Sequence, residues 1–231
     1  MHRTVDRRAA RRVIRHTGRA GIPSTTYIII GLPGQRLGDM VGALVLLAGL
    51  PTVIGPSVFY PSPGSAVYSA LQADRALPGD FALMRSSAFP VETRDASRLE
   101  LVTLMRLARW LNWVKRRLAR CGAAPVRLDD LHRDPRLCAL PPQDCAASAG
   151  GGTMAACSPL DADAAGKILT GLMLRHHCFF GMRRVGTHTP QGYVYELFPY
   201  DTAQTVMERF FAASGRVRIT AAAGTVQACT D

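Results

Sequence analysis

The hydrophobic and polar positions between residues 21 and 71 predict a strand, a helix and a second strand. Residues 25–30 read TTYIII, a β-branched and aromatic run of strand length that stops at a glycine. Apolar residues then recur at helical spacing from 37 to 48, with Asp39 in the first turn, where a carboxylate suits the positive helix end. Residues 52–60 are again apolar and are followed by prolines and a glycine, which predicts a second strand and its end.

A strand, a crossover helix and a strand within so short a stretch form a βαβ unit, so we expect the two strands to be parallel and buried. The loops after the strands, residues 31–35 and 61–65, then emerge at the same edge of the sheet. The carboxyl ends of parallel strands are where α/β sheets and barrels bind ligands. This edge is the candidate functional site. A tight turn without a ligand is the alternative interpretation of the first loop.

The two loops carry paired motifs, G-L-P-G-Q after the first strand and Y-P-x-P-G-S after the second. In this order and at this separation they resemble the late strands of the radical S-adenosylmethionine (SAM) core, which is a partial β/α barrel. The resemblance implies that residues 1–71 are the C-terminal portion of such a barrel, and that the cofactors are SAM and a 4Fe-4S cluster. It also implies that six residues lie near the adenosyl end of SAM: Ile29, Gly31, Leu32, Gln35, Tyr60 and Pro61.

The cysteines depart from that family. Radical SAM chemistry needs three cysteines, usually spaced C-x-x-x-C-x-x-C, whereas this chain has no cysteine before Cys121 and none of its 6 cysteines shows that spacing. We therefore expect a fragment of a radical SAM enzyme, inactive alone and without metal ligands of its own. A missing N-terminal half-barrel or a partner chain would supply the cluster. The sequence indicates neither the substrate nor the catalytic residues.

We interpret the cysteines as reduced thiols of a cytoplasmic protein, because the chain is too long and too apolar to need a disulfide framework. A metal site within Cys138, Cys145 and Cys157 is the alternative, although zinc ligands usually come in close pairs.

The remainder of the chain predicts a connection, a long helix and a further domain. Residues 72–121 contain Ser97 and Glu100 at the spacing of a capping box, followed by an apolar stripe and a basic end. Residues 122–157 are rich in proline and glycine, which predicts a flexible linker and a domain boundary. Residues 158–231 predict a small accessory domain.

Within that accessory domain we expect a helix over residues 158–177, a strand over 193–198, a helix that begins at Asp201 or Thr202, and a hairpin formed by 216–220 and 225–229. The adjacent His176 and His177 would project about 100° apart on a helix, which argues against a shared catalytic or metal site. The fold prediction is therefore α/β: a partial radical-SAM-like β/α barrel fragment followed by a small α+β C-terminal domain.

The net charge is +11, from 28 basic and 17 acidic residues. Arginines crowd a predicted helix over residues 4–17 and the end of the long helix. The alternative function is therefore a non-catalytic protein that binds nucleic acid through Arg7–Arg19 and residues 115–120. Residues 40–73 carry no charge, but prolines interrupt the run, so we expect no membrane-spanning helix.

Overall fold

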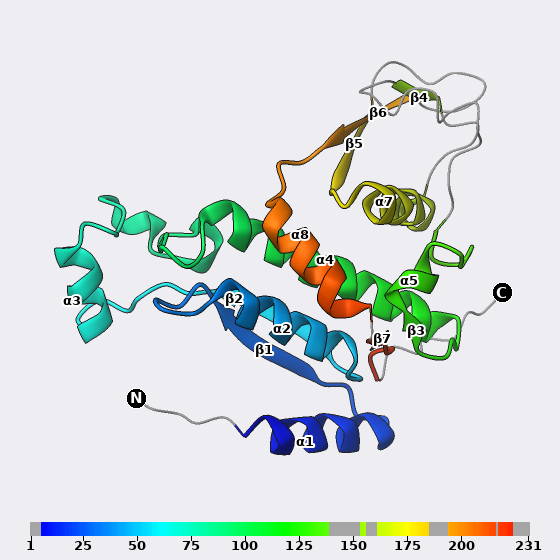
Figure 1. Cartoon of the computed structure of the whole chain (residues 1–231), viewed down its shortest axis with the longest axis horizontal. Coiled ribbons are helices and arrows are strands. Elements are labelled where there is room, and N and C mark those ends of the chain that lie inside the picture. The colour runs from blue at the N-terminus through cyan, green and yellow to red at the C-terminus, as the bar shows by residue number, and fades with distance from the viewer. Residues whose placement is uncertain (1–5, 139–152, 156–160, 185–193, 216, 224–231) are drawn as a thin grey trace.

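The computed structural model describes residues 6–138, 153–155, 161–184, 194–215 and 217–223. Within these residues the chain is a mixed α/β protein whose sheets hold two or three strands each and close no barrel. The long helix α4 (Arg98–Arg120) runs through the middle of the molecule, with α2 (Leu37–Ala48) and α8 (Gln204–Ser214) beside it (Figure 1). The expected mixture of helices and strands is confirmed, and the finer assignment to a radical SAM barrel stays a prediction.

The predicted βαβ unit is present. β1 (Thr25–Ile30) and β2 (Val53–Val58) pair in parallel, in a register that sets Thr25 opposite Val53 and Ile30 opposite Val58, and α2 connects them. β1 and α2 have the predicted bounds, and β2 is shorter than residues 52–60 at both ends. The expectation that both strands are buried is wrong for β1. Its residues alternate between exposed and partly buried because helices cover only one face of the pair.

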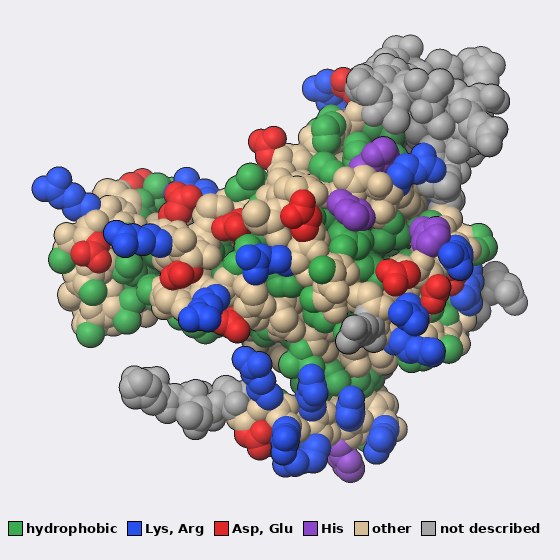
Figure 2. Space-filling model, viewed as in Figure 1, with side chains coloured by type: hydrophobic (Ala, Val, Ile, Leu, Met, Phe, Trp, Pro, Cys, Tyr) green, Lys and Arg blue, Asp and Glu red, His purple; other side chains and the backbone are tan. Residues whose placement is uncertain are grey.

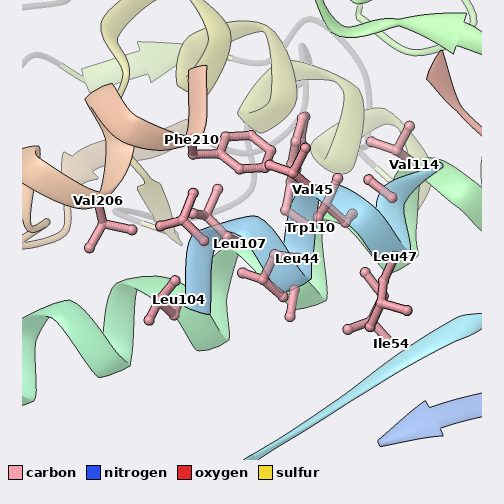
Figure 3. Packing of buried hydrophobic residues seen from close by; sticks show 14 of the residues in the cluster. Leu44, Val45, Leu47, Ile54, Leu104, Leu107, Trp110, Val114, Val206 and Phe210 are labelled. Atoms are coloured by element: carbon pink, nitrogen blue, oxygen red, sulfur yellow. The ribbon is translucent and has the colours of Figure 1, made fainter. Parts of the chain in front are cut away.

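Helices α2, α4 and α8 share one hydrophobic core over that covered face (Figure 3). Leu44 of α2, Leu107 of α4 and Phe210 of α8 are fully buried. Trp110 meets Phe210 edge to face, with the ring centroids 6.3 Å apart, and its indole N–H donates to Thr170 Oγ1 at 3.2 Å. The sequence placed the segment of α8 in an accessory domain, whereas its apolar face completes the same core as the βαβ unit.

Part of the predicted linker is folded. β3 (Val126–Arg127) and α5 (Leu128–Leu131) lie within residues 122–157. The apolar residues of this stretch enter the core: Leu128, Leu131 and Leu137. A flexible linker is therefore wrong for residues 126–138, because leucines between the prolines provide enough apolar surface to dock. The stretches 139–152 and 156–157 lie outside the described residues.

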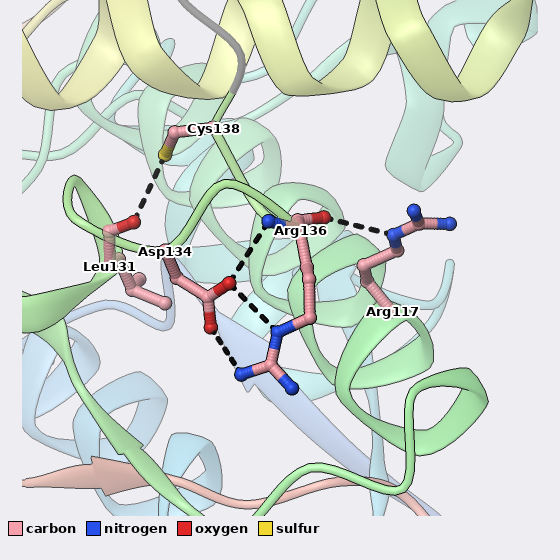
Figure 4. A network of polar contacts seen from close by, with 5 residues as sticks. All are labelled: Arg117, Leu131, Asp134, Arg136 and Cys138. Atoms are coloured by element: carbon pink, nitrogen blue, oxygen red, sulfur yellow. Dashed lines mark hydrogen bonds and ion pairs between the residues drawn. The ribbon is translucent and has the colours of Figure 1, made fainter.

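Polar contacts hold the segment that follows α5 (Figure 4). Asp134 accepts from Arg136 Nε at 2.9 Å and from Arg136 Nη2 at 2.6 Å. These bonds lower the pKa of the Asp134 carboxyl. The Arg136 carbonyl accepts from Arg117 of α4 at 2.9 Å, and Cys138 Sγ donates to the Leu131 carbonyl at 3.2 Å. The segment is thus tied both to itself and to the long helix.

The C-terminal part adds α7 (Ala162–His176), β4 (Thr153–Ala155), β5 (Phe180–Arg184) and β6 (Val194–Pro199), the strands forming an antiparallel sheet in the order β4-β6-β5. The helix and the strand predicted here are confirmed, with slightly different bounds. A small second cluster, Ile168 and Leu172 with Phe180 and Leu197, joins α7 to this sheet.

Two predictions for the C-terminal part are corrected. α8 begins after Ala203, whose N–H donates to Thr103 Oγ1 of α4 at 3.0 Å, rather than at a side-chain cap from Asp201 or Thr202. β7 (Arg218–Ile219) pairs antiparallel with β3. A pairing with β3 takes the place of the expected hairpin for this strand, and residues 225–229 lie outside the described part.

Helix α1 (Arg7–Arg19) lies against the body by its C-terminal end. Ile14 packs on the core, and Gly18 lies so close to Pro51 that an added Cβ would come 2.3 Å from Pro51 Cγ.

Three short elements follow β2. They are α3 (Ala66–Ala73), which the sequence did not predict, and two 3-10 turns, η1 (Phe81–Leu83) and η2 (Ser86–Ala88). They form the irregular connection expected before α4.

Candidate functional site

The two loops predicted to form a site lie next to each other. Because β1 and β2 are parallel and in register, Ile29 lies opposite Ser57 and Ile30 opposite Val58. The ladder extends by one further bond, from the Phe59 N–H to the Ile30 carbonyl at 2.8 Å. The structure therefore sets the strand end that carries Ile29 and Gly31 beside the strand end that leads into Tyr60 and Pro61. Leu32 and Gln35 lie in the first loop, where they bond to each other.

The first loop requires its glycines. Gly31 is buried with φ +80°, and an added Cβ would lie 3.0 Å from Leu101 Cδ1 of α4. Its N–H points to Met40 Sδ of α2 at 3.2 Å. Gly34 also has a positive φ, +77°. Glycine at 31 thus serves a close approach to α4, which is a structural role that needs no ligand.

Gln35 bridges the two ends of the same loop. Its Oε1 accepts from the Leu32 N–H at 3.2 Å, and its Nε2 donates to the Ile29 carbonyl at 3.3 Å. The side-chain amide thereby satisfies backbone groups on both sides of the turn. We assign Gln35 a positioning role, holding the exposed Leu32 beside the strand end.

The second loop has one buried and one exposed member of the predicted pair. Pro61 is buried, whereas Tyr60 is 47% exposed. Gly64 turns the chain with φ +79°, and Ser65 then caps α3 by accepting from the Tyr68 N–H at 3.1 Å. The Y-P-x-P-G-S motif therefore accounts for a turn and a helix start, with Tyr60 left free at the strand end.

The outer face of the β1–β2 pair is open, which was not predicted from the sequence. Tyr27 is 79% exposed and Ile29 53% exposed, and both point away from the helices. The ring of Tyr27 lies over Gly55, its register partner, where an added Cβ would come 2.8 Å from the ring. The burial along β1 alternates, but TTYIII itself has no alternation of polar and apolar residues, so the sequence carried no signal for the open face.

The two edges of this pair differ. Ser24 and Ile30 carbonyls accept from β2, so the backbone groups of Thr25, Tyr27 and Ile29 point to the opposite edge of β1. Within the described part of the chain no strand pairs there. Of these groups, the Ile29 carbonyl is bonded by Gln35. β1 therefore presents an edge that can accept another strand.

The outer edge of β2 is closed by α4. Asn112 Oδ1 accepts from the Ile54 N–H at 2.9 Å, and Asn112 Nδ2 donates to the Ile54 carbonyl at 2.7 Å. The next residue facing this edge is Pro56, which has no N–H to offer. A further strand cannot pair with β2 without displacing α4, so the sheet can grow only from β1.

Lys115, one turn after Asn112, completes this contact. Its side chain is fully buried, and Nζ donates to the carbonyls of Leu50 and of Thr52, the latter at 3.0 Å. Burial lowers the pKa of Lys115 from 10.5 to about 7. Lys115 therefore cannot belong to an exposed nucleic-acid surface, which corrects that part of the alternative hypothesis. The neighbouring Arg117 is paired with Asp163 at 2.8 Å.

The described residues do not provide a cluster site. Cys121, Cys138 and Cys178 follow three different helices, and no group of three His, Cys, Asp or Glu side chains within the described ranges could hold a metal ion. The adjacent histidines contact different rings: His176 lies 5.5 Å from Phe180, and His177 stacks on Phe211 at 4.0 Å. A 4Fe-4S cluster therefore does not fit the described residues.

A comparison with protein-family models and with curated protein sequences finds no match to this chain. Among the helices that the structure describes, none combines the length and apolar character needed to cross a lipid bilayer.

Proposed function

We propose that this chain is the late-strand part of a radical SAM barrel, completed by strands that add to the free edge of β1. The supporting observation is the asymmetry of the β1–β2 pair: one edge is closed by Asn112 and Pro56, while the other edge and the outer face are open. In this proposal the added strands come from a further segment or a partner chain, which also supplies the cluster.

The residues at the strand ends would contact the adenosyl group of SAM. Ile29, Leu32 and Tyr60 are exposed at the ends of the two strands, and Gln35 holds the first loop in place. When bound, SAM and its cluster supply a 5′-deoxyadenosyl radical in complete members of the family. This chain would contribute binding and orientation, since its described residues hold no cluster ligands.

Saturation-transfer NMR with SAM tests this proposal on the chain itself. We expect transfer to the adenine protons, and loss of the signal in Ile29→Asp. Ile22→Asp is a matched control, because Ile22 is also 53% exposed but precedes β1 at its amino end. Absence of transfer to the wild-type chain, or equal loss in both variants, would contradict the proposal.

Nucleic-acid binding remains a second candidate because of α1. Its arginines, Arg7, Arg8, Arg11, Arg12, Arg15 and Arg19, are all exposed. Basic side chains gather along this helix at the lower edge of the molecule (Figure 2). Fluorescence anisotropy with single-stranded RNA at several salt concentrations tests it: affinity should fall steeply with salt, and no binding at low salt would exclude it.

A further inference from the structure

Three arginines from two elements line a cavity of about 380 Å³ between α1, the C-terminal end of α2 and β7. They are Arg11 and Arg15 of α1 and Arg218 of β7, and no acidic residue of the described chain lines the cavity with them. The other walls are largely apolar, formed by residues such as Val45, Leu46 and Val217. A hollow of this size falls in the range of small-molecule sites.

The docking of α1 points two of these arginines toward the body. Ile14 packs on the core, and Gly18 touches Pro51, so these two residues define the inner face of the helix. Arg11 and Arg15 are four residues apart and lie on the same face as Ile14 and Gly18. An amphipathic helix normally places apolar side chains at such positions. Here they carry charge that faces the cavity.

Arg218 also lies opposite a residue of the same charge. In the antiparallel β3–β7 pair it lies directly opposite Arg127, and like charges at opposed positions destabilise a sheet. The ion pairs among the described residues involve none of Arg11, Arg15 and Arg218. Within the part of the chain that the structure describes, no ion pair to a carboxylate therefore relieves the repulsion between these guanidinium groups.

The C-terminal end of α2 does not explain the arginines either. Cations suit a helix C-terminus because its last carbonyls lack partners. At this end the Ala48 carbonyl accepts from the Thr220 N–H at 3.0 Å, and the Gly49 carbonyl accepts from Thr220 Oγ1 at 3.4 Å. These two carbonyls already have a donor in Thr220, so they do not require the guanidinium groups.

We propose that this cavity binds the phosphate group of a phosphomonoester whose remaining part is apolar. Guanidinium groups match phosphate oxygens in geometry and charge, and such charge-assisted hydrogen bonds are stronger than neutral ones. The apolar walls contact the carbon part of the ligand. This site is separate from the strand ends and does not depend on the radical SAM proposal.

Isothermal titration calorimetry with hexyl phosphate and with inorganic phosphate tests the site. We expect hexyl phosphate to bind more tightly, because only it reaches the apolar walls. The double variant Arg11→Gln/Arg15→Gln and the single variant Arg218→Gln should each weaken binding by at least about tenfold. The matched control Arg12→Gln/Arg19→Gln removes the same charge from the same helix, outside this cavity, and should retain binding.

Absence of hexyl phosphate binding to the wild-type chain, equal affinity for both phosphates, or equal weakening by the two double variants would overturn the proposal. Vesicles of phosphatidylcholine with phosphatidic acid distinguish the sources of the ligand. Binding that needs Arg11 and Arg15 assigns a lipid headgroup, and hexyl phosphate binding without vesicle binding assigns a free phosphomonoester. Displacement of hexyl phosphate by RNA that depends equally on Arg12 and Arg19 would replace the cavity with an extended nucleic-acid surface.

Discussion

The side-chain amide of Asn112 occupies the position of a neighbouring strand at Ile54, bonding both its N–H and its carbonyl. A helix side chain thus ends the sheet on one side. Sheet edges are templates for unwanted pairing, and covering them with a helix is one of the ways in which proteins block this. The sheet can therefore be extended at one edge only, because β1 can receive a further strand and β2 cannot.

Asn112→Leu should lower the free energy of unfolding by about 1–3 kcal/mol, because the backbone groups of Ile54 lose their partners while Leu fills a similar volume. Urea denaturation measures the change. Arg109→Ala on the same helix is the control, since Arg109 is exposed and should change stability by less than about 0.5 kcal/mol. A loss of stability in Asn112→Leu that is no larger than the small change in Arg109→Ala would contradict the role of Asn112 at this edge.

Lys115 predicts a pH dependence of stability. The pKa of Lys115 is about 7 in the folded chain, whereas its ordinary value, which applies to the unfolded chain, is 10.5. Between these two pH values the unfolded state therefore binds more protons than the folded state. The free energy of unfolding should therefore rise with pH, by about 2 kcal/mol between about pH 7 and 9. Below about pH 7 both states are protonated and this contribution is constant. Urea titrations across this window should show the rise in the wild type and a flat response in Lys115→Met.

Cys138 should resist alkylation. It is 8% exposed, and burial raises the pKa of its thiol from 9.0 to about 11, so little thiolate forms near neutral pH. Cys121 and Cys178 are partly exposed and serve as internal references. Brief iodoacetamide treatment of the native chain at mildly alkaline pH, followed by peptide mass spectrometry, should label these two well before Cys138. Labelling of Cys138 at the same rate would contradict its burial.

Gly31→Ala and Gly42→Ala should change the stability of the fold in opposite directions. At Gly31 a side chain meets Leu101 at 3.0 Å in a positive-φ conformation, so alanine should destabilise by about 1–3 kcal/mol. Gly42 is exposed in α2 with nothing within 4 Å of an added Cβ, so alanine should stabilise by about 0.5–1 kcal/mol. Thermal unfolding by circular dichroism measures both, and destabilisation by both changes would contradict the assignment for Gly42.

Local patterns were sufficient for several elements. The bounds of β1 and α2 follow from the composition of TTYIII and from the helical spacing that begins at Leu37. The Ser97–Glu100 capping box forms as predicted, with the Glu100 N–H bonded to Ser97 Oγ at 3.3 Å and the Ser97 N–H bonded to Glu100 Oε2 at 2.8 Å. A capping bond between residues three apart and a helical spacing of apolar residues both depend only on neighbours in the chain, so the sequence alone predicts them.

The site was determined by sequence only in outline. The two motifs predicted neighbouring loops, and the parallel register brings them together. The open face with Tyr27, the capped edge at Ile54 and the burial of Lys115 were decided by tertiary structure. Asn112 reaches a residue 58 positions away, β3 pairs with the distant β7, and α8 joins the core of the βαβ unit. Such contacts depend on which faces meet after the chain has folded, and no local pattern specifies that.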